Sequence, residues 1–274
     1  MELGCKKLGI MVNLFSSKKE LNIQIDSKVY ITSSNFNIIA GPCSVESEEQ
    51  IVEIAKQVKK CGANILRGGA FKPRTSPYDF QGLGEEAIKF LLTAKKEAKI
   101  PVVTEITNIN QINLFEDIDI IQVGCRNMQN YDLLRELGKT KKPILLKRAI
   151  SATLREWLYS AEYILREGNE KVILCERGIR TFQQDLRNTV DFGGIALLKR
   201  ETNLPIFVDP SHGTGNASIV PDIALASVAL GVSGLMLEVH SNPAESLSDA
   251  AQTISVEEFA KLKKKIDDLR KVIK

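Results

Sequence analysis

The chain has 274 residues, of which 43% are hydrophobic and 26% are charged, a composition typical of a soluble globular protein with a full core. The net charge of +3 is too small to indicate a nucleic-acid surface, and no apolar run approaches the roughly 18 residues of a membrane helix. Five scattered cysteines and the absence of a secretory h-region in residues 1–34 predict reduced thiols and a cytoplasmic protein, with neither nucleic acid nor membrane as a partner.

Residues 1–36 differ in pattern from the rest of the chain. Ile23–Asp26 and Val29–Thr32 alternate between apolar and polar side chains around Ser27-Lys28, as the two strands of a small hairpin do. Thirty-six residues are too few for a convincing separate domain. We therefore predict an N-terminal extension whose hairpin caps the bottom of the domain that follows.

From residue 37 to residue 274, short apolar runs alternate with amphipathic helical stretches. Each run is apolar on both faces, as buried parallel strands are. The runs are Asn37–Ala40, Ala63–Leu66, Pro101–Thr104, Ile118–Val123, Ile144–Lys147, Val172–Cys175, Ile206–Asp209 and Gly234–Glu238. Eight such units in about 240 residues predict an α/β protein with one (β/α)8 TIM barrel. An open doubly wound sheet is the alternative, but no dinucleotide-binding G-x-G-x-x-G follows a strand.

Two helices have recognisable starts. Ser47-Glu48-Glu49-Gln50 is typical of a capping box, and the apolar face that follows is Ile51, Ile54, Ala55 and Val58. Ser255-Val256-Glu257-Glu258 opens the last helix in the same way. Its predicted apolar face is Val256, Phe259, Leu262, Ile266, Leu269 and Val272.

A basic loop, Arg67–Gly82, follows the second run. It gathers three cations and two hydroxyl groups, namely Arg67, Lys72, Arg74, Thr75 and Ser76. Arginine forks match phosphate or carboxylate, and lysine adds a point charge. The alternative is a solvated basic loop, but Pro73 and Pro77 stiffen this segment, as a pre-organised anion site requires.

Further polar residues stand at the carboxyl ends of the other runs, which form the working face of a barrel. They are Cys43, Ser44, Glu105, Cys125, Arg126, Asn127, Lys147, Arg148, Glu176, Arg177, Asp209, His212, Glu238, His240 and, in the next loop, Asp249. Arg67, Lys72, Arg126, Lys147 and Arg177 would converge in a closed barrel. Structural pairing explains one or two of these cations, and the remainder indicate a bound anion.

A second group suggests a metal site. Cys43, His212, Glu238 and Asp249 offer one thiolate, one imidazole and two carboxylates, which suit a borderline divalent ion such as Mn, Zn, Fe or Co. No CxxC-type spacing supports this site. A lone cysteine can instead be a small buried apolar side chain, which we favour for Cys61 and Cys175.

Several motifs together resemble one enzyme family over about residues 35–274. They are Ala40–Ser44, Lys72–Ser76 with Phe80–Gly82, Arg126–Asn130, Leu146–Arg148, Glu176–Gly178 and Asp209–His212. The family is that of the 3-deoxy-D-arabino-heptulosonate 7-phosphate (DAHP) synthases, in their short type related to the 3-deoxy-octulosonate-phosphate synthases. The resemblance implies a transferase that condenses phosphoenolpyruvate with erythrose 4-phosphate to DAHP and phosphate, the first step of the shikimate pathway to aromatic amino acids.

The resemblance also implies a role for each matched residue. The ligands of one divalent metal ion would be Cys43, His212, Glu238 and Asp249. Phosphoenolpyruvate would be held by Arg67, Lys72, Arg126, Lys147 and Arg177, and the phosphate of erythrose 4-phosphate by Arg74, Thr75 and Ser76. Glu105 would lie near the reacting water, so the catalytic set is Lys72, Cys43, His212 and Glu105. A homo-oligomer, dimer or tetramer, is expected by analogy.

Other interpretations remain open. Lys147 could be the Schiff-base lysine of an aldolase-type barrel. A barrel that senses a phosphorylated metabolite without turnover is another possibility. Lys72-Pro73-Arg74 favours the DAHP synthases, because the octulosonate branch, which accepts a five-carbon sugar phosphate, reads Lys-Ala-Asn-Arg there.

The chain departs from the family at Cys125, where alanine is common, and we expect this thiol to be tolerated beside the site but open to oxidation. The first 36 residues are too short for the regulatory domain of some relatives. We therefore expect no feedback inhibition through such a domain, and we expect no chorismate mutase segment after the last helix.

Overall fold

Eight parallel strands form a closed barrel in the computed structural model, which describes residues 20–273. The strands are β3 (Asn37–Gly41), β4 (Ile65–Arg67), β5 (Val102–Ile106), β6 (Ile120–Val123), β7 (Ile144–Lys147), β8 (Val172–Glu176), β9 (Ile206–Val208) and β10 (Gly234–His240). Each pairs with the next in sequence, and β10 pairs with β3 to close the ring. A short strand, β11 (Ile254–Ser255), pairs with the end of β10. The predicted (β/α)8 barrel is thus confirmed, and every predicted run overlaps one strand.

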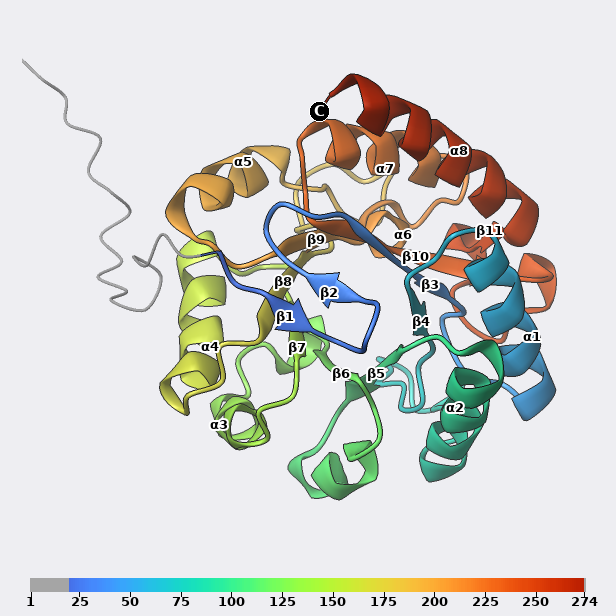
Figure 1. Ribbon diagram of the computed structural model, residues 1–274, viewed down its shortest axis with the longest axis horizontal. Helices are drawn as coiled ribbons and strands as arrows, with labels where there is room; N and C mark the ends of the chain where they lie inside the picture. Colours follow the sequence, from blue (N-terminus) through green and yellow to red (C-terminus); the bar gives the residue numbers. More distant parts are fainter. Residues whose placement is uncertain (1–19, 274) are drawn as a thin grey trace, which may run out of the picture.

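The helices form the outer ring (Figure 1). They are α1 (Glu48–Lys60), α2 (Glu85–Ala98), α3 (Tyr131–Lys139), α4 (Leu154–Arg166), α5 (Phe192–Glu201), α6 (Pro210–Thr214), α7 (Val220–Ala229) and α8 (Val256–Val272). Within residues 20–273 there are also four 3-10 helices: η1 (Ile109–Phe115), η2 (Cys125–Asn127), η3 (Pro243–Glu245) and η4 (Ala250–Gln252). Between β5 and β6, η1 stands where the barrel pattern would place an α-helix.

The two predicted capping boxes have different outcomes. At α8 the box is complete, because Ser255 caps Glu258 N and the Glu258 side chain accepts from Ser255 N. At α1, Ser47 accepts from Gln50 N, but the Gln50 carboxamide accepts from Glu46 N instead. The prediction of a reciprocal box there is wrong. The predicted apolar face of α8 is also too long, since Val272 is 82% exposed in the last turn.

The lower half of the barrel interior is apolar. Every strand contributes to a single buried cluster through Ile39, Ile65, Val103, Ile120, Leu145, Ile173, Phe207 and Met236, and β8 adds Cys175 as a second member. The hairpin of β1 (Ile23–Gln24) and β2 (Tyr30–Ile31) covers this layer, with Ile23 and Ile31 packed into the same cluster. It lies across the barrel end in Figure 1. The predicted hairpin is therefore present, while residues 1–19 of the extension predicted over residues 1–36 lie outside the described residues.

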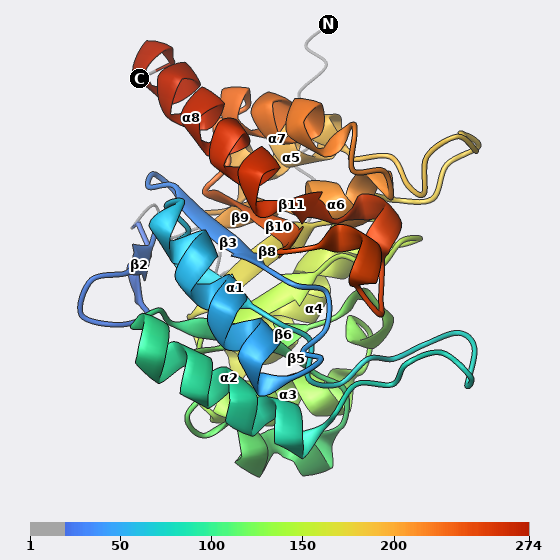
Figure 2. The same ribbon diagram turned by 90° about the vertical axis from the view of Figure 1, so that its right-hand side faces the viewer.

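The opposite end of the barrel carries the long loops. Side chains on a strand alternate, so the next inward position lies two residues beyond the apolar layer. Those positions are Gly41, Arg67, Glu105, Gln122, Lys147, Cys175, Asp209 and Glu238. The β4–α2 and β8–α5 loops extend on this side, away from the hairpin (Figure 2). The same strands thus build an apolar floor and a polar layer above it.

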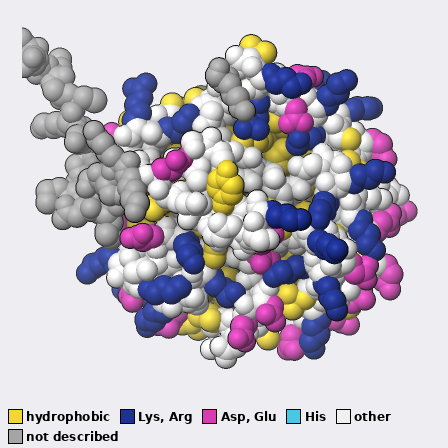
Figure 3. All heavy atoms as spheres, in the orientation of Figure 1, with side chains coloured by type: hydrophobic (Ala, Val, Ile, Leu, Met, Phe, Trp, Pro, Cys, Tyr) yellow, Lys and Arg dark blue, Asp and Glu magenta, His cyan; other side chains and the backbone are white. Residues whose placement is uncertain are grey.

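The outer surface carries charge of both signs. Lys and Arg side chains are spread together with Asp and Glu over the face that bears the hairpin (Figure 3), in keeping with the small net charge. Among the described helices, none has the length and apolar character needed to cross a membrane.

Candidate active site

The polar layer is held together by buried ion pairs. Arg67 Nη1 lies 2.9 Å from Glu238 Oε1, and Lys147 Nζ lies 2.6 Å from Asp209 Oδ2. Burial by itself lowers the pKa of Lys147, but the Asp209 carboxylate outweighs it and the pKa is raised. Buried charges need such partners because the interior solvates them poorly. Two of the five predicted cations are therefore paired with carboxylates of the protein, and both remain charged.

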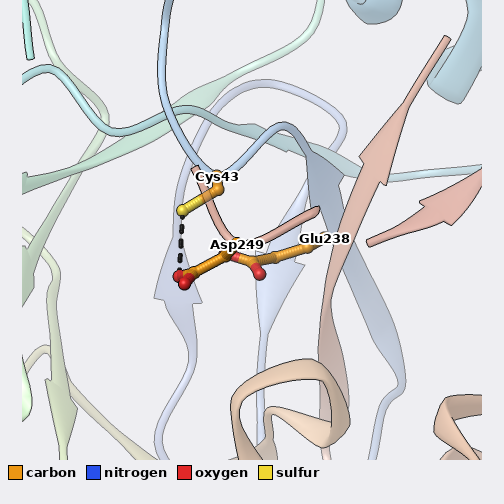
Figure 4. A group of neighbouring side chains, drawn as sticks. All are labelled: Cys43, Glu238 and Asp249. Carbon is orange, nitrogen blue, oxygen red and sulfur yellow. Dashed lines mark hydrogen bonds between the residues drawn. The ribbon is translucent and has the colours of Figure 1, made fainter. Parts of the chain in front are cut away.

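Three of the four predicted metal ligands meet above this layer. The ligand atoms of Cys43, Glu238 and Asp249 all lie within 4.8 Å of one another. Cys43 follows β3, Glu238 lies in β10, and Asp249 lies in the loop after β10. Figure 4 shows the three side chains directed toward one another, with Cys43 Sγ 3.2 Å from Asp249 Oδ2.

His212, the fourth predicted ligand, approaches the same point from α6. Its Nε2 atom lies 3.4 Å from Glu238 Oε1 and 3.7 Å from Asp249 Oδ2. Asp209 caps α6 by accepting from His212 N, and its other oxygen lies 2.8 Å from His212 Nδ1. Burial lowers the pKa of His212 to about 4, so the ring is neutral at pH 7. With the Nδ1 proton bonded to Asp209, Nε2 presents a lone pair, as metal-binding histidines do.

The donor set fits a divalent cation. Burial, with Glu238 nearby, raises the pKa of Cys43 to about 12, so the thiol stays protonated unless a strong positive charge stabilises the thiolate. Lys72 Nζ donates to Cys43 Sγ at 3.0 Å and to the Cys43 carbonyl at 3.0 Å. A thiol, a neutral imidazole and two carboxylates are the ligands that Zn, Mn, Fe or Co accept.

A polar pocket adjoins these four groups. It is lined by Lys72, Pro73, Arg74, Glu105, Gly124, Cys125, Arg126, Lys147, Arg177, Arg187, His212 and Asp249. Arg177 is 4% exposed, and within residues 20–273 its guanidinium has no hydrogen bond or ion pair. A buried guanidinium without a protein partner favours an anion as its ligand. Four of the five cations predicted to hold phosphoenolpyruvate line this pocket.

The remaining predicted residues are more dispersed. Arg67 does not line the pocket, because it is buried against Glu238 in the layer below. Arg74 Nε donates to Phe80 O within its own loop, and Ser76 Oγ accepts from Tyr78 N in the same loop. Thr75 Oγ1 lies 3.4 Å from Arg126 Nη2. The structure therefore brings Thr75 toward the pocket but leaves Ser76 within its own turn.

Glu105 lines the pocket and is held in place from two sides. Gln122 Nε2 donates to Glu105 Oε2 at 2.9 Å. The other oxygen lies over Gly124, where an added Cβ would be 1.9 Å from Oε1. A residue with a side chain at position 124 would displace this carboxylate, so the glycine is needed for close approach.

Two residues that contact the predicted metal ligands were not predicted from the sequence. Arg187 lies in the β8–α5 loop, and its Nη1 atom is 2.8 Å from Gln252 Oε1 and 3.5 Å from Asp249 Oδ1. Gln252 is buried and donates to Glu238 Oε2 at 2.6 Å. No spacing marks either residue, because Arg187 lies in the middle of a long loop and Gln252 in a 3-10 turn.

Comparisons with known proteins agree with one another. The family model described as "DAHP synthetase I family" matches residues 20–274. A phospho-2-dehydro-3-deoxyheptonate aldolase of Thermotoga maritima is 47% identical over 235 residues, which is 85% of this chain and 70% of that protein. A 2-dehydro-3-deoxyphosphooctonate aldolase of Syntrophobacter fumaroxidans is 28% identical and covers 89% of this chain and 90% of its own length. A solved truncated form of the 3-deoxy-D-arabino-heptulosonate 7-phosphate synthase from Thermotoga maritima superposes with a TM-score of 0.86 and 40% identity, covering 93% of this chain and 94% of that one.

Proposed function

The chain belongs to the DAHP synthetase I family, and from that premise we propose that it condenses phosphoenolpyruvate with erythrose 4-phosphate at the pocket described above. The products would be 3-deoxy-D-arabino-heptulosonate 7-phosphate and inorganic phosphate, with one divalent metal ion required. This is the reaction of the DAHP synthases, a transferase class to which the chain is assigned by its family.

One observation carries the proposal. Four groups of metal-binding chemistry stand beside a pocket that holds a buried, unpartnered arginine, Arg177, and three further cations, Lys72, Arg126 and Lys147. Phosphoenolpyruvate carries a phosphate and a carboxylate, and several cations in fixed positions suit both. A site that only captured an anion would need no neutral histidine and thiol directed at the same point.

The chain's own residues would act mainly by positioning. Arg177, Arg126 and Lys147 hold phosphoenolpyruvate, and Arg74 and Thr75 receive the phosphate of the sugar at the outer end of the pocket. C3 of phosphoenolpyruvate then forms a bond to the aldehyde carbon as the C2–C3 double bond becomes single, and the aldehyde oxygen takes up a proton to become a hydroxyl group. Water adds to C2, and the C–O bond to phosphate breaks, which releases inorganic phosphate and leaves a ketone at C2. Glu105 would orient that water and take its proton. Holding two polyanions in register replaces a bimolecular encounter with a positioned one.

Cys43, His212, Glu238 and Asp249 would hold the metal ion. When bound, a divalent ion supplies a Lewis acid that polarises the aldehyde or orients the water. Lys72 donates to Cys43 Sγ and also lines the pocket, so its ammonium would stabilise the thiolate ligand and add to the positive charge that faces phosphoenolpyruvate.

A Schiff-base mechanism at Lys147 is less well supported. An amine nucleophile must be deprotonated, whereas the Asp209 carboxylate raises the pKa of Lys147. Borohydride treatment in the presence of pyruvate-like substrates should therefore leave Lys147 unmodified. A covalent adduct at that residue, located by peptide mapping, would refute its assignment as an anion ligand.

A phosphate-release assay tests the proposed function. We expect release when phosphoenolpyruvate and erythrose 4-phosphate are both present, none with either alone, and loss of release after chelation that added Mn or Zn reverses. Arabinose 5-phosphate is the matched control substrate, and it should be used far less well. Preference for it would move the chain to the octulosonate branch, while no release with any pair would leave a metabolite sensor as the better interpretation.

A further inference from the structure

Two residues that the sequence did not predict, Arg187 and Gln252, form a small polar network with both carboxylates of the proposed metal site. Arg187 Nη1 lies 2.8 Å from Gln252 Oε1 and 3.5 Å from Asp249 Oδ1. Gln252 Nε2 in turn lies 2.6 Å from Glu238 Oε2. The network therefore runs from a loop residue, through a buried amide, to the two acidic groups that face Cys43.

The chemistry of the groups determines the orientation of the amide. A guanidinium can only donate hydrogen bonds, so Gln252 must present its oxygen to Arg187. Its NH2 group is then left to donate to Glu238, a carboxylate that only accepts. Glu238 Oε1 is bonded to Arg67, so Gln252 fixes the second oxygen and with it the rotation of the carboxylate.

Asp249 depends on such contacts more than Glu238 does. Glu238 lies inside β10, where pairing with β3 and a bond from its N–H to Ser211 Oγ hold the backbone. Asp249 lies in the loop after β10 with a left-handed backbone, at a φ of 54°. Its carboxylate contacts Cys43 and Arg187, which come from two other loops.

The segment that carries Arg187 is anchored to the helix that carries His212. Arg187 N donates to Thr214 O, and Asn188 Nδ2 donates to His212 O at 3.1 Å. Gly215, at a φ of 68°, makes room for this approach, because an added Cβ there would lie 2.6 Å from Arg187 Cβ. The β8–α5 loop thus joins the element bearing His212 to the one bearing Asp249.

We propose that Arg187 and Gln252 are positioning residues that hold Glu238 and Asp249 in the arrangement that binds the metal ion. The proposal rests on the metal site proposed above. Arg187 is 42% exposed at the side chain and lines the pocket, so the competing role is direct contact with a phosphorylated substrate. The two roles differ in what they change: the first alters metal affinity, and the second alters the KM of a substrate at saturating metal.

The test is a Co²⁺ titration of the metal-stripped full chain, followed by the absorption of the cobalt–thiolate bond to Cys43. Arg187→Met should weaken Co²⁺ affinity roughly 10- to 100-fold, the usual effect of removing a group that orients a metal ligand. Arg187→Lys should restore part of it, because an ammonium still donates to Gln252 but lacks the fork. Arg180→Met, an equal loss of charge from an exposed position in the same loop, should leave the affinity unchanged.

A double-mutant cycle sharpens the assignment. If Arg187 acts through Gln252, then Arg187→Met and Gln252→Met together should weaken Co²⁺ binding by less than the product of the single losses. Thermal melting of each variant shows that it is folded. At saturating metal, the KM values of both substrates should stay close to those of the parent protein.

The possible contrary results are distinct. Unchanged Co²⁺ affinity in Arg187→Met, with a parent that binds normally, would overturn the positioning role alone. A higher KM for one phosphorylated substrate at unchanged affinity would assign Arg187 to substrate binding instead. Failure of the parent protein to bind Co²⁺ would refute the proposed metal site, and this proposal with it.

Discussion

The same eight strands build two unlike layers inside the barrel. Near the hairpin, the inward residues are aliphatic or aromatic, and Ile23 and Ile31 close them off. Two residues further along each strand, the inward positions carry Arg67, Lys147 and Glu238 among others. Burial is nearly complete in both layers, so exposure does not distinguish them. The two layers differ in chemistry: the polar layer contains buried ion pairs where the other layer contains apolar contacts.

Within a single strand, therefore, one inward side chain mainly stabilises the fold, while the next inward side chain mainly positions polar groups. The apolar layer gains free energy by removing hydrocarbon from water. A buried ion pair gains little over a well-packed apolar pair, but removing one partner costs a great deal because the other charge is left unsolvated. The polar layer is therefore best explained by the groups that its contacts hold in place, namely Glu238 and Lys147 within the layer and His212 beside it.

The largest effect is expected from breaking a pair in the polar layer. Asp209→Asn leaves the Lys147 ammonium buried without its counter-charge, and it leaves one acceptor oxygen, where Asp209 offers two, to His212 N, His212 Nδ1 and Lys147 Nζ. We expect a loss of about 3–5 kcal/mol in the free energy of unfolding, measured in urea. Metal affinity should also fall roughly 10- to 100-fold.

The matched control for that variant is Asp132→Asn, the same chemical change at an exposed pair with Arg135 on α3. It should have little effect on either quantity, because water already solvates both charges. Equally small effects at the two positions would mean that Lys147 does not depend on Asp209, and would remove the basis for treating the layers as different.

A smaller effect, confined to stability, is expected in the apolar layer. Ile31→Ala opens a cavity between the hairpin and the barrel floor and should cost about 2–5 kcal/mol in urea unfolding. Activity per folded molecule should not change, since the site lies at the other end. Tyr30→Ala, at the adjacent exposed position, is the control and should cost about 0.5 kcal/mol or less. A large fall in specific activity of Ile31→Ala would show that the two ends are coupled.

The smallest effect concerns chemical access rather than energy. Cys175 is fully buried inside the barrel, and burial raises the pKa of its thiol, whereas Cys125 is half-buried and lines the pocket. Iodoacetamide should modify Cys125 faster than Cys175 by about two orders of magnitude or more, because Cys175 becomes accessible only when the barrel opens. Peptide mapping by mass spectrometry measures both rates. Comparable rates in the folded protein would contradict the description of the interior.

Much of the fold was predictable from the sequence because the repeating pattern is local. Short runs that are apolar on both faces indicate buried parallel strands, and each of the eight runs overlaps a strand of the barrel. The run ends were placed one or two residues too early at β4 and β10, so that Arg67 lies within a strand rather than in a loop. The strands were predicted from runs of apolar residues, so a polar inward side chain at the end of a strand is assigned to the following loop.

The sequence predicted which residues lie at the candidate site better than it predicted how they contact one another. The placement of Cys43, His212 and Glu238 at strand ends predicted that they would meet, because parallel strands end on one side of a barrel. Arg187 and Gln252 carry no such mark. Their contact joins residues 65 positions apart, and the pair of Arg67 with Glu238 joins residues 171 apart. Local sequence periodicity carries no information about contacts between residues so far apart along the chain.

The sequence by itself determined the alternation of strands and helices, which follows from the period of the side chains, and it placed polar residues at the carboxyl ends of most strands. Barrel closure decided the rest: which cations are neutralised, which nitrogen of His212 keeps its proton, and that the Arg177 guanidinium has no hydrogen bond or ion pair within residues 20–273. These outcomes depend on distances of a few ångströms in a poorly solvating interior, and such distances exist only once β10 has paired with β3.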